Sequence, residues 1–318
     1  MSALSRASAQ YSTKIDNEGL LGDPKPMWRQ AISRLLGIRS GQIGLVIILV
    51  LLFIAAFADL IAPYNPQQVL IGVEQVKKRE APCVHILGCD VSKPQHLMGI
   101  DGNVRDEFSR VLHGTRVSLT IGLTTVSAAL IFGVFFGAIS GYFGGWVDMI
   151  IMRLMDVILG FPSLLLAIAI VAVLGPGIQN ALLAISIVTL PQYARVTRAS
   201  VLSVKELDFV AASKVMGASH RHILFFRVLP NAMTPIVVLA TLGIATAILD
   251  AAGLSFLGLG AQPPMPEWGT MLGSERNQIF SAPHLVFFPG IAIMITVLGF
   301  NLLGDGLRDA LDPRLNHS

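Results

Sequence analysis

The sequence predicts an all-α membrane protein with six transmembrane helices. Of its 318 residues, 53% are hydrophobic and 14% are charged, whereas roughly 25% of residues are charged in an ordinary soluble domain. Six apolar segments approach the ~20 residues that cross a bilayer. The net charge of +3 comes without a basic tract, which gives no support to nucleic-acid binding. Two cysteines are too few for a disulfide-rich scaffold.

The six segments follow one another with clear boundaries. Residues 43–62 form the first, whose only charge is Asp59, and the segment is too long for a cleavable signal peptide. Residues 117–139 form the second and carry no charge. The uncharged stretch 157–194 is too long for one span and is broken at Gly175-Pro176-Gly177, so it predicts a third and a fourth span joined by a hairpin. Residues 233–249 and 285–303 are the fifth and sixth.

Basic residues predict the orientation of these spans. With the N-terminus inside, the inward segments hold 15 Lys and Arg and the outward segments hold 8, as the positive-inside rule expects. The chain then divides into a cytoplasmic N-terminal segment at 1–42, the first span, a long extracytoplasmic loop at 63–116 and a core at 117–318. We therefore expect a multi-pass protein of the cell membrane with both termini in the cytoplasm.

The inward segment 203–228 is the most informative loop. Leu207, Val210, Ala211 and Lys214 lie at i, i+3, i+4 and i+7, which predicts a short amphipathic helix. Gly217 is placed to end it, and a second helix is expected from 218 to 228, stopped by Pro230. A solvated connector is the simplest interpretation of such a projection. The small side chains of residues 211–213, however, favour the close approach of another surface.

The same loop resembles the cytoplasmic coupling loop of ABC importer permeases. That pattern has Glu-Ala-Ala, three residues, Gly, nine residues and Ile-x-Leu-Pro. Here Ala211 replaces Glu and Arg227 replaces Ile, while Gly217, Leu229 and Pro230 keep their spacing. Further strings along the chain resemble the C-type permease subunit of the dipeptide/oligopeptide (peptide/nickel) importer family: residues 61–66, 98–101, 105–106, 109–110, 141–145, 258–264, 266–269 and 304–313. Val104 stands where that family usually has glycine, and the outward loop is enlarged between Cys83 and Cys89.

The resemblance implies a type I ABC importer permease that carries di- or oligopeptides. The expected partners are a homologous second permease, two ATP-binding subunits, an extracytoplasmic substrate-binding protein and membrane lipid. Leu207, Val210, Ala211 and Met216 are expected to pack the loop helix, which would act as a lever, and Lys205, Glu206 and Lys214 to make rim contacts with the ATPase. The residues assigned to the ATPase-coupling loop are Leu207, Val210, Ala211, Ala212, Lys214, Met216, Gly217, Leu229 and Pro230. No Gly-x-x-x-x-Gly-Lys-Ser/Thr motif occurs, so ATP and Mg²⁺ are expected on the partner chains, with no cofactor in this one.

Alternatives remain open at this level. A permease for nickel, glutathione or another small solute would carry the same motifs, and an ATP-independent carrier or channel is the alternative from a different class. An enzyme is not expected, because no Gly-x-Ser-x-Gly or His-Glu-x-x-His motif occurs.

Three further sets of residues carry predictions. Asp250 lies at the end of the fifth span and is a candidate for the translocation path, with a structural hydrogen bond as the alternative. Cys83 and Cys89 favour a disulfide, and a zinc site with His85 and His96 is the competing interpretation. Asp148, Arg153 and Asp156 are expected to pair within one helix.

Overall fold

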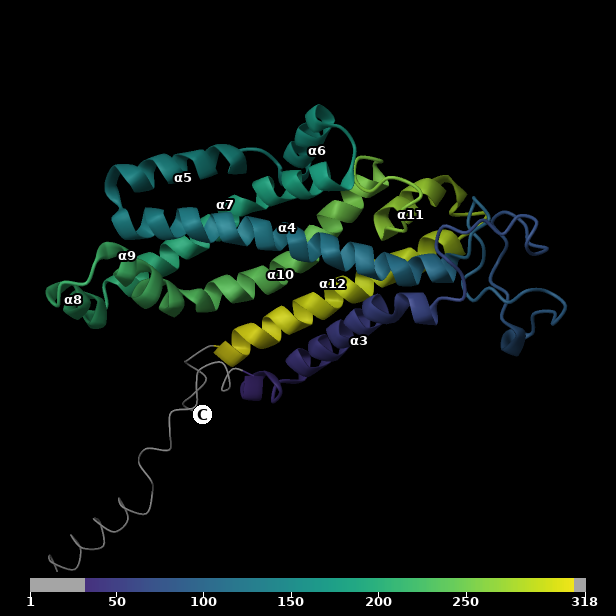
Figure 1. Ribbon diagram of the computed structural model, residues 1–318, viewed down its shortest axis with the longest axis horizontal. Coiled ribbons are helices and arrows are strands. Elements are labelled where there is room, and N and C mark those ends of the chain that lie inside the picture. The colour runs from purple at the N-terminus through teal and green to yellow at the C-terminus, as the bar shows by residue number, and fades with distance from the viewer. Residues whose placement is uncertain (1–31, 312–318) are drawn as a thin grey trace, which may run out of the picture.

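The computed structural model describes residues 32–311 as a helical bundle, in which no β-strand forms. Its long helices are α3 (Arg39–Ile61), α4 (Glu107–Phe143), α7 (Ile178–Lys205), α10 (Leu229–Phe256) and α12 (His284–Leu311). They lie along the long axis of the molecule (Figure 1). One end carries α8 (Asp208–Val215), the start of α3 and the end of α12, and the other carries α11 (Trp268–Glu275). We call these the α8 end and the α11 end.

The helices confirm a protein that crosses a membrane several times. Four are long and apolar enough to span: α3, α4, the continuous helix from His220 to Phe256, and α12. The pair α5 (Gly145–Leu159) and α6 (Ser163–Leu174) counts as a fifth if the two are taken together. The predicted fourth span corresponds to α7, whose second half carries Arg195, Arg198 and Lys205. A count of six spans therefore stays a prediction. The N-terminal segment 1–42 falls mostly outside the described residues.

The second predicted span is longer than its apolar run. The carboxylate of Asp106 accepts a hydrogen bond from the Ser109 backbone N–H at 2.8 Å, which caps α4 and starts the helix at Glu107. The last ten residues of the predicted extracytoplasmic loop 63–116 are therefore helical, and the membrane boundary of that loop stays a prediction. Hydropathy marks only the part of a helix that lies in lipid, and α4 continues beyond it.

The third predicted span is not one straight helix. The break at 175–177 is present, between α6 and α7, but α6 has only 12 residues. It meets α5 at an angle of 89°, at Gly160, Phe161 and Pro162. Proline lacks a backbone N–H and restricts the residue before it, so the helix cannot run through this point.

Ion pairs join α5 to α7, where pairing between residues of α5 was expected. The Arg198 guanidinium binds both carboxylate oxygens of Asp148 at 2.5 Å, and Arg195 binds Asp156 at 2.6 Å. The prediction that Arg153 would pair with these acids within one helix is wrong. The two arginines lie on a neighbouring helix, which sequence spacing on α5 does not reveal.

Close backbone packing joins α4 and α7. Gly133, Gly137 and Gly141 recur every four residues on α4, and a Cβ at any of them would collide with Tyr193, Ala194 or the carbonyl of Arg198 on α7. Small residues at this spacing let two membrane helices approach closely. The Ser186 hydroxyl of α7 also donates to the carbonyl oxygen of Thr125 on α4 at 3.1 Å. These two helices form a rigid centre on which the α8 end is built.

Candidate functional site

The loop at the α8 end folds into a compact projection. After α7 ends at Lys205, α8 occupies Asp208–Val215, and Gly217 adopts φ of +80°. This left-handed conformation suits glycine and turns the chain back. Ser219 then accepts a hydrogen bond from the His222 backbone N–H at 3.3 Å, which caps the next turn.

The second helix of the loop does not stop where proline predicts. The short α9 (His220–His222) continues into a π-helical segment, η2 (Ile223–Val228), and then directly into α10. Pro230 directly follows the π-helical turn of η2, which interrupts the regular hydrogen-bond ladder that a proline would otherwise break. The expected helix end before Pro230 is therefore wrong. The loop is instead continuous with a membrane-spanning helix.

One face of the projection is buried against the bundle. Val210 is fully buried and Ser213 is 5% exposed. Val210 packs with residues of η2 and α10 on Ala138 of α4 and Val201 of α7. Because this chain covers Val210, its side chain packs the base of the projection and is not part of the exposed surface. Leu229 is half-buried in the same cluster.

The opposite face is exposed and partly apolar. Val215 is 88% exposed and Met216 is 77% exposed. The other members of this face are also exposed: Leu207, Phe209, Ala211, Ala212, Lys214 and Gly217. Pro230, at the start of α10, is exposed as well. We call residues 207, 209, 211, 212 and 214–217 the coupling face.

Sequence reasoning missed two members of this face, Phe209 and Val215. At about 100° per residue, Val215 lies about 140° around the helix from the buried Val210. A helical projection centred on Val210 and Ser213 would have placed Val215 on the outer side. The chosen stripe mixed residues of both faces instead.

Polar contacts with α4 support the base of the projection. Lys205 Nζ, at the end of α7, donates to the carbonyl oxygen of Gly141 on α4 at 3.0 Å, and its rim contact with a partner stays a prediction. The Tyr142 hydroxyl lies 3.0 Å from Nδ1 of His220. Glu206 and Lys214 remain exposed, as a rim contact requires. Together with the apolar cluster around Val210 and the continuity with α10, these polar contacts join the coupling face to α4, α7 and α10.

The predicted path residue lies apart from the coupling face. Asp250 is half-buried near the α11 end of α10. Its carboxylate makes no hydrogen bond or ion pair with residues 32–311. A structural hydrogen bond, the alternative interpretation of Asp250, is therefore not seen in the described chain.

The two cysteines are joined. Cys83 and Cys89 form a disulfide in the segment between α3 and α4. The zinc alternative finds no support, because the part of the chain that the structure describes contains no group of three or more His, Cys, Asp or Glu arranged to hold a metal ion. His85 instead lies 2.9 Å from the carbonyl oxygen of Lys93.

His96 anchors the same segment to the start of α4. Its Nδ1 lies 2.8 Å from Asp106 and its Nε2 lies 3.1 Å from Glu74, and the ring is 3% exposed. Burial opposes the charged ring, but hydrogen bonds and charges from Asp106 and Glu74 outweigh it and raise the pKa of His96 above 6.5.

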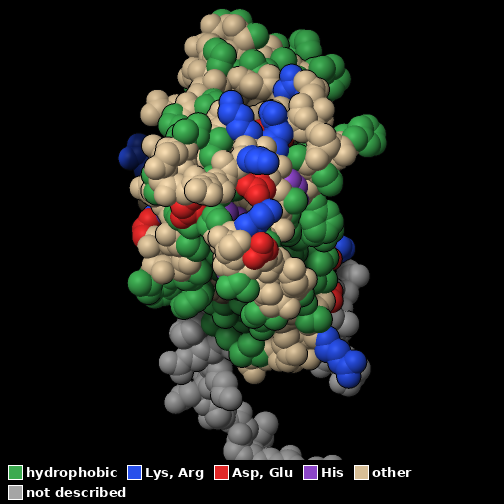
Figure 2. All heavy atoms as spheres, turned by 90° about the vertical axis from the view of Figure 1, so that its right-hand side faces the viewer, with side chains coloured by type: hydrophobic (Ala, Val, Ile, Leu, Met, Phe, Trp, Pro, Cys, Tyr) green, Lys and Arg blue, Asp and Glu red, His purple; other side chains and the backbone are tan. Residues whose placement is uncertain are grey.

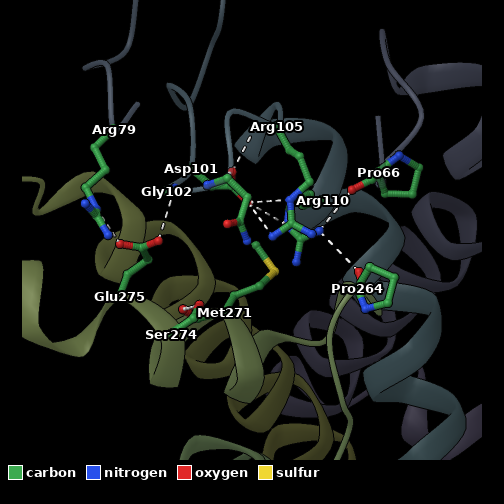
Figure 3. Close-up of polar contacts among 11 residues, drawn as sticks. Pro66, Arg79, Asp101, Gly102, Arg105, Arg110, Pro264, Met271, Ser274 and Glu275 are labelled. Carbon is green, nitrogen blue, oxygen red and sulfur yellow. Dashed lines mark hydrogen bonds and ion pairs between the residues drawn. The ribbon is translucent and has the colours of Figure 1, made fainter. Parts of the chain in front are cut away.

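At the α11 end, contacts of buried charged side chains join segments from three regions of the sequence (Figure 3). Asp101 accepts a hydrogen bond from Arg105 Nε at 2.7 Å and lies 3.5 Å from Arg110. Arg110 also donates to the carbonyl oxygens of Pro66 at 2.9 Å and Pro264 at 3.4 Å. The segments after α3, before α4 and after α10 therefore meet at one guanidinium.

A second contact ties this end to α11. Arg79 Nε binds Glu275 at 2.8 Å, and the other Glu275 oxygen accepts the Gly102 backbone N–H at 3.1 Å. These residues were not predicted, because 196 positions separate Arg79 from Glu275 and no local pattern marks either one.

Comparison with known proteins agrees with this geometry. Residues 133–317 match the family described as "Binding-protein-dependent transport system inner membrane component". Residues 26–81 match the "N-terminal TM domain of oligopeptide transport permease C".

Individual relatives extend the match over most of the chain. A dipeptide transport system permease protein of Alkalihalophilus pseudofirmus is 48% identical, and the match covers 91% of this chain and 90% of the relative. A glutathione transport system permease protein of Pectobacterium atrosepticum is 42% identical over 92% and 91%.

The fold is also similar to that of a solved transporter chain. A chain of the MetNI methionine ABC transporter, solved in inward-facing conformations, is 18% identical with a TM-score of 0.53, and the match covers 64% of this chain and 97% of that one. The chain belongs to the family of inner membrane components of binding-protein-dependent transport systems, as a C-type permease of the dipeptide/oligopeptide ABC importer branch.

Proposed function

We propose that this chain is one of two homologous permease subunits of an ATP-driven importer of di- and oligopeptides, and that it forms half of the translocation path. The coupling face carries this proposal, because it is an exposed, partly apolar surface on a base fastened to three long helices. The relative from Alkalihalophilus pseudofirmus, named for dipeptide transport, supports the choice of substrate.

The coupling face is the proposed binding site of one ATP-binding partner subunit. The second permease would bind another, so that the complex contains two. Val215 and Met216 are the proposed apolar contacts, with Glu206 and Lys214 at the rim. ATP and Mg²⁺ would be bound by those partners, since this chain has no P-loop. An external substrate-binding protein would deliver the peptide.

We propose that the α8 end, which carries the start of α3 and the end of α12, faces the cytoplasm, as the predicted cytoplasmic location of both termini requires. The excess of Lys and Arg in segments on this side supports the orientation. The α11 end would then face outward, with the residues between α3 and α4.

The proposed mechanism is a lever. Closure of the ATPase pair pushes on α8, and the cluster around Val210 passes the displacement to α4 and α7. Because α9 and η2 continue into α10 without a break, the same push rotates a membrane-spanning helix. Asp250 on α10 lies near the other end of that helix and is the proposed contact for cargo in the path.

Import into proteoliposomes tests the proposal. The complete complex of two permeases, two ATPases and the binding protein should import a dipeptide, added outside with the binding protein, only when ATP is enclosed inside the sealed vesicles, on the side of the coupling face. Glutathione is the second candidate, favoured by the relative from Pectobacterium atrosepticum, and Ni²⁺ serves as a third cargo. Import by the two permeases alone would establish an ATP-independent carrier or channel and refute the proposal.

Asp250 has its own test in the same vesicles. Asp250→Asn should lower peptide import several-fold while the complex still assembles and hydrolyses ATP. Unchanged import by this variant would remove Asp250 from the path.

A further inference from the structure

Two highly exposed apolar side chains of the α11 end lie on a disulfide-closed loop. Between Cys83 and Cys89, Ile86 is 94% exposed and Leu87 is 84% exposed. Both belong to a single 3-10 turn, His85–Leu87, which Gly88 ends. Val91, just past the disulfide, is 79% exposed. Two large apolar side chains are thus held at a tip where nothing in residues 32–311 covers them.

The base of this loop is rigid. Cys83 and His96 pair through both backbone N–H groups, at 2.9 and 3.1 Å. The His96 ring is fixed in turn by Asp106, the residue that caps α4. We call residues 83–96 the Cys83 loop. The exposed tip of this loop is therefore held in a defined conformation by its base.

The loop lies too far along the bundle to rest in lipid. Asp59 near the end of α3 pairs with Arg116 of α4 at 3.1 Å, which marks where the apolar runs of both helices stop. From Arg116, α4 continues nine residues to Glu107, or about 14 Å at 1.5 Å per residue. The headgroup layer adds only about 5–7 Å on each side of the hydrocarbon. In Figure 1 the blue loops between α3 and α4, which include the Cys83 loop, extend beyond this end of α4.

Positive charge surrounds the tip. Lys77, Lys78 and Arg79 before the loop and Lys93 within it are exposed, as is the carboxylate of Asp90. Arg79 pairs with Glu275 and Lys93 lies 3.9 Å from Glu80, whereas Lys77 and Lys78 form no ion pair within residues 32–311. Lys and Arg side chains gather across this end of the molecule (Figure 2). A complementary partner would offer an apolar pocket with carboxylates around it.

We propose that the Cys83 loop is a docking knob that inserts Ile86 and Leu87 into an apolar, carboxylate-rimmed pocket of the external substrate-binding protein. The inference rests on the proposed function, which supplies such a water-soluble partner at the α11 end. Docking at this loop would also be transmitted to the translocation path. Arg79 joins this segment to α11, and Arg110 joins it to the loop after α10.

The test measures the Kd of the binding protein for the complete importer complex in lipid nanodiscs. Ile86→Ser with Leu87→Ser should weaken binding at least about tenfold, as expected for anchoring apolar side chains. The matched control is Ile71→Ser with Val73→Ser, whose side chains are 65% and 63% exposed on the same segment outside the loop, and its Kd should stay unchanged. Cys83→Ser with Cys89→Ser should also weaken binding, because the tip loses its shape. Lys77→Gln with Lys78→Gln should reduce the salt dependence of the Kd.

Four outcomes would overturn the inference. The first is an unchanged Kd for the Ile86 and Leu87 variant, and the second is an equally weakened Kd in the matched control. Loss of the second permease from the purified complex of the Ile86 and Leu87 variant would instead show that the tip contacts that permease. A weakening of the Kd that is seen in nanodiscs but not in detergent micelles would show that the tip contacts lipid. Failure of the proposed function looks different, because the wild-type complex would then neither bind the binding protein nor import peptide.

Discussion

Gly217 offers a sharp test of the proposed lever, because a side chain there strains the backbone without colliding with neighbouring atoms. Its φ is +80°, and a Cβ added there would meet no atom within 4 Å. Gly217→Ala therefore adds backbone strain without a collision, at a cost of about 1–2 kcal/mol for a left-handed residue. That cost lowers the equilibrium constant for the observed turn about 5- to 30-fold.

A matched control separates this strain from a general loss of stability. Gly72 has φ of +79° and also has open space around its Cβ position, but it lies between α3 and α4, far from the coupling face. Gly72→Ala should therefore destabilise the protein about as much as Gly217→Ala. Only the variant at Gly217 should lower the number of peptides imported per ATP hydrolysed.

Gly217→Arg adds a charged side chain to the same strain. It should abolish coupling, so that the ATPase pair hydrolyses ATP with little or no uptake while the permease stays inserted. The assay is peptide import and phosphate release measured together in proteoliposomes of the complete complex. Wild-type uptake per ATP by Gly217→Arg, or an equal loss of coupling in Gly72→Ala, would refute the lever.

Three further predictions concern packing, ion pairing and pH. Val210→Ala should lower the free energy of unfolding by about 1–3 kcal/mol because it leaves a cavity, whereas Val215→Ser should change it by less than about 0.5 kcal/mol yet weaken ATPase binding. Thermal unfolding measures the first effect and co-purification with the ATPase the second, and the reverse pattern would contradict the assignment of the buried and exposed faces. A double-mutant cycle of Asp148→Asn and Arg198→Gln should give a coupling energy of about 0.5–1 kcal/mol, since both side chains are partly exposed; additive effects would show that this pair does not fasten α5. His96 has a raised pKa in the folded protein, so its stabilisation is complete below pH 6.5 and is lost as the pH rises through the raised value; the melting temperature should fall over that range in the wild type and less in His96→Gln, and parallel curves would contradict the role of His96.

Several parts of the fold follow from local sequence because their signals are local. Apolar runs predict helices in lipid, and Gly175-Pro176-Gly177 predicts the break between α6 and α7, which the structure confirms. The family strings placed the chain among ABC importer permeases, which the relatives confirm. The prediction of a short helix ended near Gly217 is likewise confirmed, with φ of +80° at that glycine.

Other parts depend on neighbours that local patterns do not show. Arg153 was a reasonable partner for Asp148 by spacing, but Arg198 of α7 lies closer in space. Pro230 stops a helix in isolation, whereas the π-helical turn before it lets η2 and α10 continue as one.

The sequence by itself determined the membrane class, the family and the position of the loop at 203–228. Composition and short motifs are sufficient for these, because lipid selects apolar length and the loop pattern is contiguous. Tertiary structure decided which side of that loop is free, since Val210 is covered by residues of four other elements, α4, α7, η2 and α10. It also joined Arg79 to Glu275 across 196 positions. Burial and ion pairing depend on distances in space, and those are set only when the helices pack.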